Sequence, residues 1–475
     1  MSTALRAASL LAASSLLAAC DAESVVLPAE GHVLVHVDTD APVPPPPGSL
    51  AAPGTPAPLF DRLSVEVYAP GSAEPCDGCV RELQLDEAVL RAGGSFAVEP
   101  AGARSGVRVR LRMYRAAGHL EGEPAPEATV ETTVRLPDVP REGAVDVRVF
   151  LPTDAVGVPA GSIEAPLPAE AGAWSASRAG TWPGAQRIDC PAPPAPGEVC
   201  IPGGAFWMGN PLAQEDPKLA ATRQRLVVLS PFYLDAREVT AGEYRAAKLP
   251  VGEVVYWSGD TAGDEVEDFC TLSLPTVESR DALPIACITW AGARAYCQAR
   301  GADLPTEAEL EYVLGGLASN PYLWGVDPPR CADAIWSRAE TSITGFTNFY
   351  CSADVPPGDI GGALVLPPDA ADQAAAPPRL RDRLVLPTGT VFDLEGNVTE
   401  WARDTWNRQD EPCWTHEGPN VFVDPLCETP GVDGDLRPIR GGGWGSNAST
   451  LRAAHRTANK AIEAALTGGM RCARR

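Results

Sequence analysis

Thirteen cysteines are spread along the 475-residue chain, and twelve of them follow Cys20. The segment before Cys20 carries one basic residue, Arg6, and then an apolar run that ends in Leu17-Ala18-Ala19. This arrangement is typical of a secretory signal, so the twelve remaining cysteines form an even set in an oxidising compartment. The sequence therefore predicts a fold that is cross-linked by disulfides.

The N-terminal segment also indicates how the chain is held in the cell. Residues 1–20 have the form of a bacterial lipoprotein signal peptide, with Cys20 at the lipobox position. The apolar run is too short to span a bilayer, so cleavage before Cys20 and lipidation of its thiol are expected. We therefore expect a lipid-anchored, extracytoplasmic protein of the bacterial cell envelope, attached to a membrane through its acyl chains.

Composition restricts the fold class and the partners. Hydrophobic residues make up 45% of the chain and charged residues 21%, which is typical of a globular protein. The chain also has 48 prolines and 45 glycines, which favour many loops and few long helices. The formal net charge of −24 argues against nucleic-acid binding and against attraction to an anionic membrane surface.

Several cysteines lie close together in the sequence and are candidate disulfide pairs, although sequence alone leaves their connectivity open. The "CDGC" stretch could be half of a zinc site, a redox dithiol or a hairpin tip closed by a disulfide. A structural disulfide is favoured, because the chain has no second CxxC motif and no surrounding βαβ pattern. The candidate pairs are Cys76 with Cys79, Cys190 with Cys200, Cys270 with Cys287, Cys331 with Cys351, and Cys413 with Cys427.

Residues 21–152 are predicted to form a small all-β sandwich of antiparallel strands with a proline-rich insertion. Short alternating runs bounded by Pro, Gly or Asp, such as "GHVLVHVDTD" and "GVRVRLRMY", are typical of such strands. The insertion, "APVPPPPGSLAAPGTPAP", could act as a spacer. His32 and His36 lie on one strand face and could bind a metal, but without a third ligand a solvated strand face is the better interpretation.

The remainder of the chain divides into a linker and a second domain. Residues 153–189 are rich in Ala, Pro, Gly and Ser, which predicts an interdomain linker. Residues 190–475 contain ten of the cysteines and nine of the eleven tryptophans. We expect these tryptophans to be core or site residues of a separate domain.

The second domain contains a series of motifs in a fixed order. They are "IPGGAFWMGN", "FYLDAREVTAGEYRAA", "PIACITWAGARAYCQARGADLPTEAELEYVLGG", "YLWG", "VFDLEGNVTEWARDTW" and "PIRGGGWGSNASTLRAAHR", followed by "MRCARR". Together they resemble the formylglycine-generating enzyme family, also called the sulfatase-modifying factor family, over about residues 195–475. The resemblance implies an α+β, loop-rich fold related to C-type lectins, held together by disulfides and calcium.

Two helices can be placed within these motifs. Trp290, Ala293 and Cys297 occur at helical spacing, and Thr306 with Glu309 forms a capping box that starts a second helix. The glutamates of this second helix could be mistaken for a catalytic carboxylate pair. First-turn acids that complement the helix dipole are the simpler interpretation.

The resemblance assigns one disulfide and one metal site. It implies that Cys297 pairs with Cys472, and that structural calcium is bound by the side chains of Asp393 and Glu400 and the backbone oxygens of Gly396 and Val398. Calcium prefers such hard oxygen ligands. Without the resemblance, Asp393 and Glu400 would be interpreted as a turn residue and a cap. A second calcium site near "CADAIWSRAETSITGF" lacks its usual acidic ligand.

The catalytic positions of the family differ in this sequence. The family's enzyme oxidises a substrate cysteine to formylglycine, using copper(I) held by two thiolates. The matching positions are Ser446 and Leu451, and no cysteine lies between Cys427 and Cys472. Copper is therefore not expected, no catalytic residue is assigned, and the glycines after Arg440 are expected to pack closely against the core.

Three functions remain open: a non-catalytic binding module for a peptide, glycan or envelope protein, a formylglycine-generating oxidase, and another oxidoreductase on the same fold. The binding module is favoured, because the thiolate positions are substituted and no histidine-rich helical region supplies an iron site. His455 could be a lone acid or base, although a partly exposed structural histidine is the better interpretation.

Overall fold

The computed structural model describes residues 31–49, 54–99, 103–117, 119–120, 123–209, 223–249, 270–271, 280–337, 351, 381–465 and 467–475. In these ranges strands predominate and helices are few and short. The predicted signal peptide and Cys20 lie outside the described residues. Within the described ranges, no helix has the length and apolar character needed to cross a bilayer.

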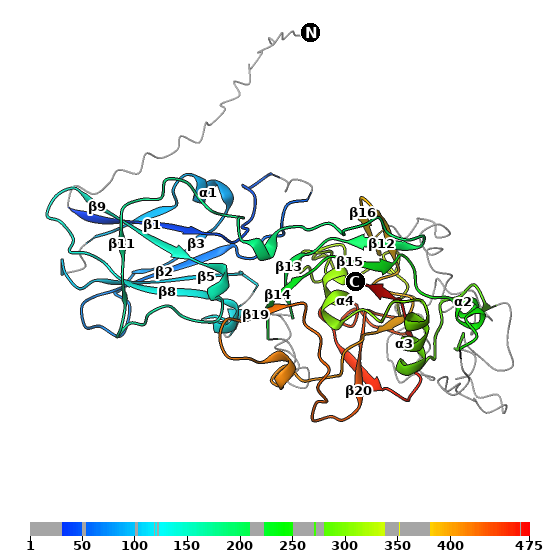
Figure 1. Cartoon of the computed structure of the whole chain (residues 1–475). Helices are drawn as coiled ribbons and strands as arrows, with labels where there is room; N and C mark the ends of the chain where they lie inside the picture. The colour runs from blue at the N-terminus through cyan, green and yellow to red at the C-terminus, as the bar shows by residue number, and fades with distance from the viewer. Residues whose placement is uncertain are drawn as a thin grey trace, which may run out of the picture.

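The first part of the chain forms two sheets around a common core (Figure 1). One sheet has the strand order β11-β9-β1-β4 and the other β10-β8-β5-β2-β3, and a short helix, α1 (Glu87–Arg91), precedes β4. The strands are β1 (His32–Thr39), β2 (Arg62–Tyr68), β3 (Val80–Gln84), β4 (Ser95–Val98), β5 (Arg108–Tyr114), β8 (Val130–Arg135), β9 (Ala144–Leu151), β10 (Leu167–Pro168) and β11 (Glu170–Ala171). A two-stranded pair, β6 (His119–Leu120) and β7 (Glu123–Pro124), follows β5.

One pairing differs from the sequence prediction. Most neighbouring strands are antiparallel, but β1 pairs with β9 in parallel over eight residues, from His32 with Ala144 to Thr39 with Leu151. The prediction of an antiparallel arrangement is wrong for this pair, because alternation reports which face is buried and not the direction of the partner. The long connection between β1 and β9 makes the parallel arrangement possible.

The two histidines of β1 do not form a solvated face. His32 is buried, so that interpretation is wrong for this residue. The Nε2 atom of His36 lies 2.7 Å from Oδ1 of Asp146 on the neighbouring strand β9. Among the described residues, no group of three or more His, Cys, Asp or Glu side chains is arranged to hold a metal ion.

The start of the proline-rich insertion and the residue that follows it pack against the sheets, whereas residues 47–49 are exposed. Val43 and Leu59 belong to the common core, and the amide of Leu59 donates a hydrogen bond to the carbonyl of Pro42. Residues 153–189, predicted as a linker, connect the two parts of the chain but also add strand β10 to one sheet and β11 to the other. Trp182 of this segment is buried, and its indole donates to Asp154.

In its described residues, the second part of the chain consists of small sheets, three short α-helices and loops. The helices are α2 (Ala241–Ala246), α3 (Trp290–Ala299) and α4 (Glu307–Leu314), and the capping box of α4 contains Thr306 and Glu309 as predicted. The last strand lies beside β15, close to the C-terminus in Figure 1. The strands are β12 (Glu198–Ile201), β13 (Gly204–Met208), β14 (Arg225–Leu229), β15 (Phe232–Asp235), β16 (Arg383–Leu386), β17 (Gly389–Phe392), β18 (Thr399–Trp401), β19 (Val421–Val423), β20 (Leu436–Arg440), β21 (Thr457–Lys460), β22 (Gly468–Gly469) and β23 (Ala473–Arg474).

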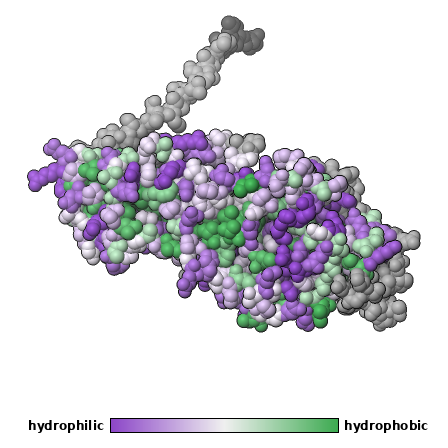
Figure 2. All heavy atoms as spheres, viewed as in Figure 1, coloured by the Kyte–Doolittle hydropathy of each residue, from purple (hydrophilic) through white to green (hydrophobic). Residues whose placement is uncertain are grey.

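The two parts share one hydrophobic core. Trp207 and Leu226, from β13 and β14, belong to the same buried cluster as the strands of the first part. The indole of Trp207 donates to the carbonyl of Leu59 at 2.7 Å, and its ring meets Phe60 edge-on at 5.6 Å. Hydrophobic surface also gathers in the middle of the molecule in Figure 2. The boundary is therefore a packed interface rather than a flexible joint.

Six disulfides connect the twelve cysteines that follow Cys20. All five local pairs are confirmed, including Cys76 with Cys79, and so is the long-range pair of Cys297 with Cys472. The long-range bond joins α3 to the C-terminal segment, across 175 residues of sequence. The C-terminal end of the chain is thereby fixed to the centre of the second part.

Candidate functional site

The three glycines after β20 lie against the loop between β17 and β18. Gly441 has a positive φ of 72°, and a Cβ atom on it would lie 2.8 Å from the carbonyl oxygen of Leu394. A Cβ on Gly443 would lie 3.2 Å from the amide nitrogen of Thr399. Only residues without a side chain allow the two backbones to approach this closely. The glycines therefore pack one loop of the chain against another.

The two positions matched to copper ligands hold groups with structural roles. The hydroxyl of Ser446 accepts a hydrogen bond from the amide of Gly443 at 2.9 Å. Leu451 is fully buried, in a cluster with Tyr322 and Trp336. Neither side chain is a soft thiolate of the kind that binds copper(I). Each stabilises the conformation of the glycine loop or of the segment that follows it.

The predicted calcium loop runs from Asp393 to Glu400 and is buried throughout. Asp393 and Asn397 have positive φ values of 52° and 63°, which turn the backbone sharply between β17 and β18. The side chain of Asn397 and the amide of Val398 both donate to the carboxylate of Glu238. Glu238 therefore holds the loop by accepting hydrogen bonds from its N–H groups. Sequence analysis does not assign Glu238 to this site.

Buried acids and a buried arginine surround this loop. Nε of Arg471 donates to Glu400 at 2.6 Å, and Nη2 of Arg471 donates to the carbonyl of Asp393 at 3.0 Å. Burial, followed by the nearby charge of Asp393, raises the pKa of Glu238 well above its usual range. Burial also raises the pKa of Glu400, although Arg471 opposes this shift. Glu238, Asp393 and Glu400 are thus buried close together, and Arg471 contacts the loop at Asp393 and Glu400.

This donor set fits a hard divalent cation. Asp393 and Glu400 supply carboxylate oxygens, and an added positive charge would offset the charge of the buried acids. Since no three such side chains converge in the described part of the chain, a cation here would also need the carbonyls of Gly396 and Val398. The second proposed calcium stretch falls partly outside the described residues.

The glutamates of α4 have a larger role than helix-dipole acids. Glu307 and Glu311 are almost fully buried, and Nη2 of Arg440 lies 3.0 Å and 2.7 Å from their carboxylates. Arg456 also pairs with Glu307. Burial alone would raise the pKa of Glu307, but Arg456 and Arg440 hold it below its usual value. The sequence interpretation of these acids was therefore incomplete, because their partners lie more than a hundred residues away.

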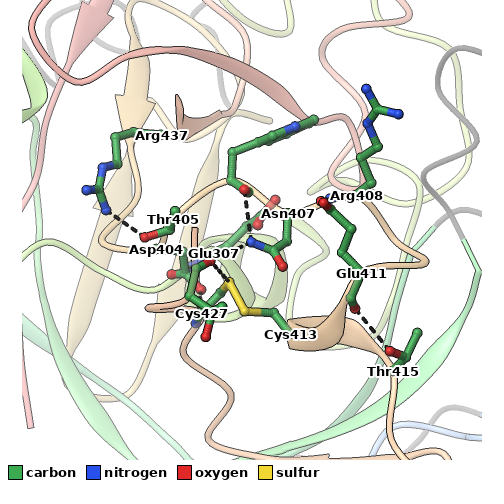
Figure 3. The surroundings of a disulfide bond; sticks show 12 residues. Glu307, Asp404, Thr405, Asn407, Arg408, Glu411, Cys413, Thr415, Cys427 and Arg437 are labelled. Carbon is green, nitrogen blue, oxygen red and sulfur yellow. Dashed lines mark hydrogen bonds between the residues drawn. A yellow bond between two sulfur atoms is a disulfide. The ribbon is translucent and has the colours of Figure 1, made fainter. Parts of the chain in front are cut away.

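A further buried acid lies beside the Cys413–Cys427 disulfide, as Figure 3 shows. Asp404 accepts hydrogen bonds from the amide of Glu307 at 2.8 Å and from the amide of Cys427 at 2.9 Å. Burial, together with the charge of Glu307, raises the pKa of Asp404 from 3.8 to about 7. Asp404 thus connects the start of α4 to the disulfide-closed loop.

The raised pKa of Asp404 predicts a specific pH dependence of stability. Because the unfolded chain loses this proton at a lower pH, the stability contributed by the group is present below about pH 4 and is lost as pH rises to about 7. Each unit by which the pKa of Asp404 in the folded chain exceeds its value in the unfolded chain corresponds to about 1.4 kcal/mol of stability. The Asp404→Asn variant should be less stable than the parent chain at pH 5, by about 1–3 kcal/mol for one lost acceptor. This deficit should shrink or disappear at pH 8.

Urea unfolding at the two pH values measures this difference. The exposed Asp435→Asn variant is the matched control. Its own difference in stability from the parent chain should be the same at pH 5 and at pH 8. A deficit of Asp404→Asn that stayed constant between pH 5 and pH 8 would contradict the assignment.

His455 is a half-buried residue behind the glycine loop. Its carbonyl accepts a hydrogen bond from Arg440 at 3.2 Å. Burial, followed by the charges of Arg440 and Arg452, lowers the pKa of His455 to about 4. The ring is therefore neutral at pH 7, and the hydrogen bond from Arg440 to the backbone of His455 is a structural contact.

A cavity of about 390 Å³ opens at the boundary between the two parts of the chain. Arg115 and Ala117, which follow β5, form one side, and residues of the second part, including Trp207, Glu311 and Arg452, form the other. Sequence reasoning missed this cavity completely. No local motif could have indicated it, because its walls come from segments that meet only in the folded chain.

Comparison with known proteins places the second part of the chain in a family. Residues 186–475, more than half of the chain, match the family described as sulfatase-modifying factor enzyme 1-like domain. The protein belongs to this sulfatase-modifying factor family, as the motifs of the second part predict. The match begins in the connecting segment, so the two-sheet part precedes the family domain.

Named relatives include both active and inactive proteins. The chain is 26% identical over 319 residues to the formylglycine-generating enzyme of Thermomonospora curvata, covering 59% of this chain and 93% of that protein. It is 24% identical over 314 residues to the inactive Cα-formylglycine-generating enzyme 2 of Bos taurus, covering 58% and 87%. Among solved structures, PvdO from Pseudomonas aeruginosa is 22% identical, with a TM-score of 0.37 over 58% of this chain and 93% of that one.

Proposed function

We propose that this protein is a lipid-anchored lipoprotein of the bacterial cell envelope that binds a peptide, glycan or envelope protein without catalysing a reaction. In this proposal Cys20 carries the lipid, the two-sheet part is a small β-sandwich, and the family domain has a C-type-lectin-like fold. The apolar N-terminal run, the cross-linked cysteines and the net charge of −24 support a secreted, anchored protein that does not bind nucleic acid.

One observation carries the non-catalytic assignment. The positions matched to the copper thiolates hold Ser446, which accepts a hydrogen bond within the glycine loop, and Leu451, which is fully buried. Every cysteine in the described part of the chain is in a disulfide. Copper(I) requires soft ligands, and these side chains offer none. The existence of a relative named as inactive is compatible with this proposal.

Copper loading tests the proposal directly. The protein, produced in an oxidising compartment, is exposed to copper(I) under anaerobic conditions and then analysed for bound metal. We expect copper below stoichiometric amounts and no oxidation of a cysteine-containing peptide. A variant with Ser446→Cys and Leu451→Cys is the matched control and should bind copper if the positions are correctly placed. Stoichiometric copper in the unaltered chain, with peptide oxidation, would favour the alternative of a formylglycine-generating oxidase.

We also propose that the loop from Asp393 to Glu400 binds structural calcium. The carboxylates of Asp393 and Glu400 and the backbone oxygens of Gly396 and Val398 would hold the ion. The support is the group of buried acids around the loop, where Glu238 joins the carboxylates of Asp393 and Glu400. Bound calcium would supply positive charge and fix the turn between β17 and β18.

Removal of calcium is expected to destabilise the family domain. At a free calcium concentration of about a hundred times the dissociation constant, binding contributes about 2.7 kcal/mol. Excess chelator should therefore lower the thermal midpoint, and added calcium should restore it. The Asp393→Ala variant should no longer respond to calcium, whereas Asp138→Ala, an exposed change in the first part of the chain, should respond fully. Equal midpoints with calcium and with chelator would remove the calcium proposal.

A further inference from the structure

The cavity at the boundary has an apolar lining. Phe206 and Trp207 of β13 contribute one wall, and Tyr322, Val326 and Pro328 contribute another. Its volume of about 390 Å³ lies within the range of pockets that hold small organic ligands. The boundary itself is well packed, since Trp207 connects the two parts through Leu59. The wall formed by Trp207 is therefore held in place by contacts with both parts of the chain.

Two guanidinium groups line this cavity from opposite parts of the chain. Arg115 follows β5, and the residues on either side of it are fixed by Asp61, whose amide donates to the carbonyl of Tyr114 and whose carboxylate accepts from the amide of Ala116. Arg452 comes from the segment after the glycine loop. Its neighbour Ala453 is held by Arg440, which donates to the Ala453 carbonyl at 3.3 Å.

Within the described residues, both arginines line the cavity without the close acidic partner that many arginines of the family domain have. The chain has 62 acidic residues and 38 basic ones, so acidic partners are abundant. Many arginines of the family domain form ion pairs, but within the described residues neither Arg115 nor Arg452 has a side-chain hydrogen bond or an ion pair. Asp61 gives Arg115 a longer-range attraction only. The paired arginines are Arg245, Arg294, Arg300, Arg381, Arg403, Arg408, Arg437, Arg440, Arg456, Arg471, Arg474 and Arg475.

The one acid in the lining does not neutralise them. The carboxylate of Glu311 accepts from the amide of Gly209 at 2.6 Å and pairs with Arg440 at 2.7 Å. Its charge is therefore already compensated on the far side of α4. The two half-buried guanidinium groups therefore give this part of the apolar cavity a positive electrostatic potential, although the protein as a whole is strongly acidic.

We propose that this cavity binds a small organic carboxylate with an apolar or aromatic body, whose carboxylate lies between Arg115 and Arg452. Guanidinium groups bind planar carboxylates through paired, charge-assisted hydrogen bonds. The body of the ligand would lie against Phe206, Trp207 and Tyr322, whose faces favour flat apolar groups. The inference concerns residues outside the calcium loop and does not depend on the absence of copper chemistry.

The matching ligand pair for the test is N-acetylphenylalanine and its uncharged amide. Isothermal titration on the full chain should detect the acid, and its affinity should fall as salt increases. The amide should bind at least about tenfold more weakly, because a charge-assisted hydrogen bond is lost. Titration with phenyl phosphate shows whether the cavity binds a phosphate more tightly than a carboxylate. A hexapeptide that ends in phenylalanine distinguishes a free small acid from the end of a peptide chain.

Variants assign the binding to the two arginines. Arg115→Gln and Arg452→Gln should each weaken binding of the acid by about tenfold to a hundredfold. Arg115→Lys and Arg452→Lys should keep part of the affinity, because the charge remains while the planar fork is lost. The exposed Arg81→Gln is the matched control and should bind as the unaltered chain does. Thermal unfolding confirms that each variant is folded.

The outcomes separate clearly. Binding of the acid that depends on both arginines supports the proposal, whether the hexapeptide also binds or not. The proposal is wrong if neither probe binds at millimolar concentration, if the amide binds as well as the acid, or if the glutamine variants bind normally. Tighter binding of phenyl phosphate would overturn the assignment to carboxylates. A failed copper test would not affect any of these results.

Discussion

Replacing Arg440 with methionine should lower the free energy of unfolding of the family domain by about 3–5 kcal/mol, the cost of breaking a buried ion pair from one side. Arg440 is fully buried, and its guanidinium lies within 3.0 Å of both Glu307 and Glu311. Methionine fills much of the same volume but leaves Glu311 without its cation. Glu307 keeps Arg456, so the loss should be concentrated at Glu311.

Urea unfolding at neutral pH measures this effect, and two further variants test its cause. Arg408→Met removes a surface arginine that pairs with Asp433, and it should cost much less than Arg440→Met because solvent screens this pair. Adding Glu311→Gln to Arg440→Met should restore part of the stability, because the uncompensated acid is removed. A loss below 1 kcal/mol for Arg440→Met, or no rescue by the second change, would contradict the assigned role of the cluster.

Replacing both Cys297 and Cys472 with alanine should destabilise the chain by about 5 kcal/mol. The bond closes a loop of 175 residues, and the loop-entropy argument assigns the largest stabilisation to the longest loops. Both cysteines are also buried in the core around α3. The double variant should unfold at much lower urea concentration than the parent chain, when both are measured without reductant.

The matched control is the pair Cys190 and Cys200, which closes only ten residues. Its double alanine variant should lose about 3 kcal/mol by the same argument. The ranking of the two variants is the critical result. Equal losses would indicate that local packing around the sulfurs, and not the length of the closed loop, determines their contribution.

Sequence reasoning succeeded where the relevant partners are close together or where a family pattern supplies them. Five disulfides could be proposed from short spacings, and the Cys297–Cys472 pair followed from the family resemblance. The capping box of Thr306 and Glu309 is equally local. Each of these features depends on a few neighbouring residues or on a recognised motif.

It failed where a side chain acquires its role from a distant segment. Glu307 and Glu311 were interpreted as helix-dipole acids, although their partner Arg440 is more than a hundred residues away. The parallel partner of β1 could not be inferred from alternation, and the composition of residues 153–189 gave no sign that they add strands to both sheets.

The candidate binding cavity illustrates the same limit. Arg115 and Arg452 are separated by most of the chain, and although Arg452 stands in the motif "PIRGGGWGSNASTLRAAHR", nothing in that motif indicates a neighbour near residue 115. Their relation depends on the packing of the first sheets against β13, through Trp207 and Leu59. Sequence alone describes each arginine as one of many basic residues in an acidic protein.

Because the two parts of the chain share a core, the residues of that core are synthesised at different times during translation. All strands of the two amino-terminal sheets have been synthesised once Ala171 is in place. Trp207 and Leu226, which complete their interior, come later. A nascent chain that ends between these points lacks Trp207, which contacts Leu59 and Phe60 in the folded chain. The amino-terminal sheets therefore reach their final packing only after the family domain has begun to form.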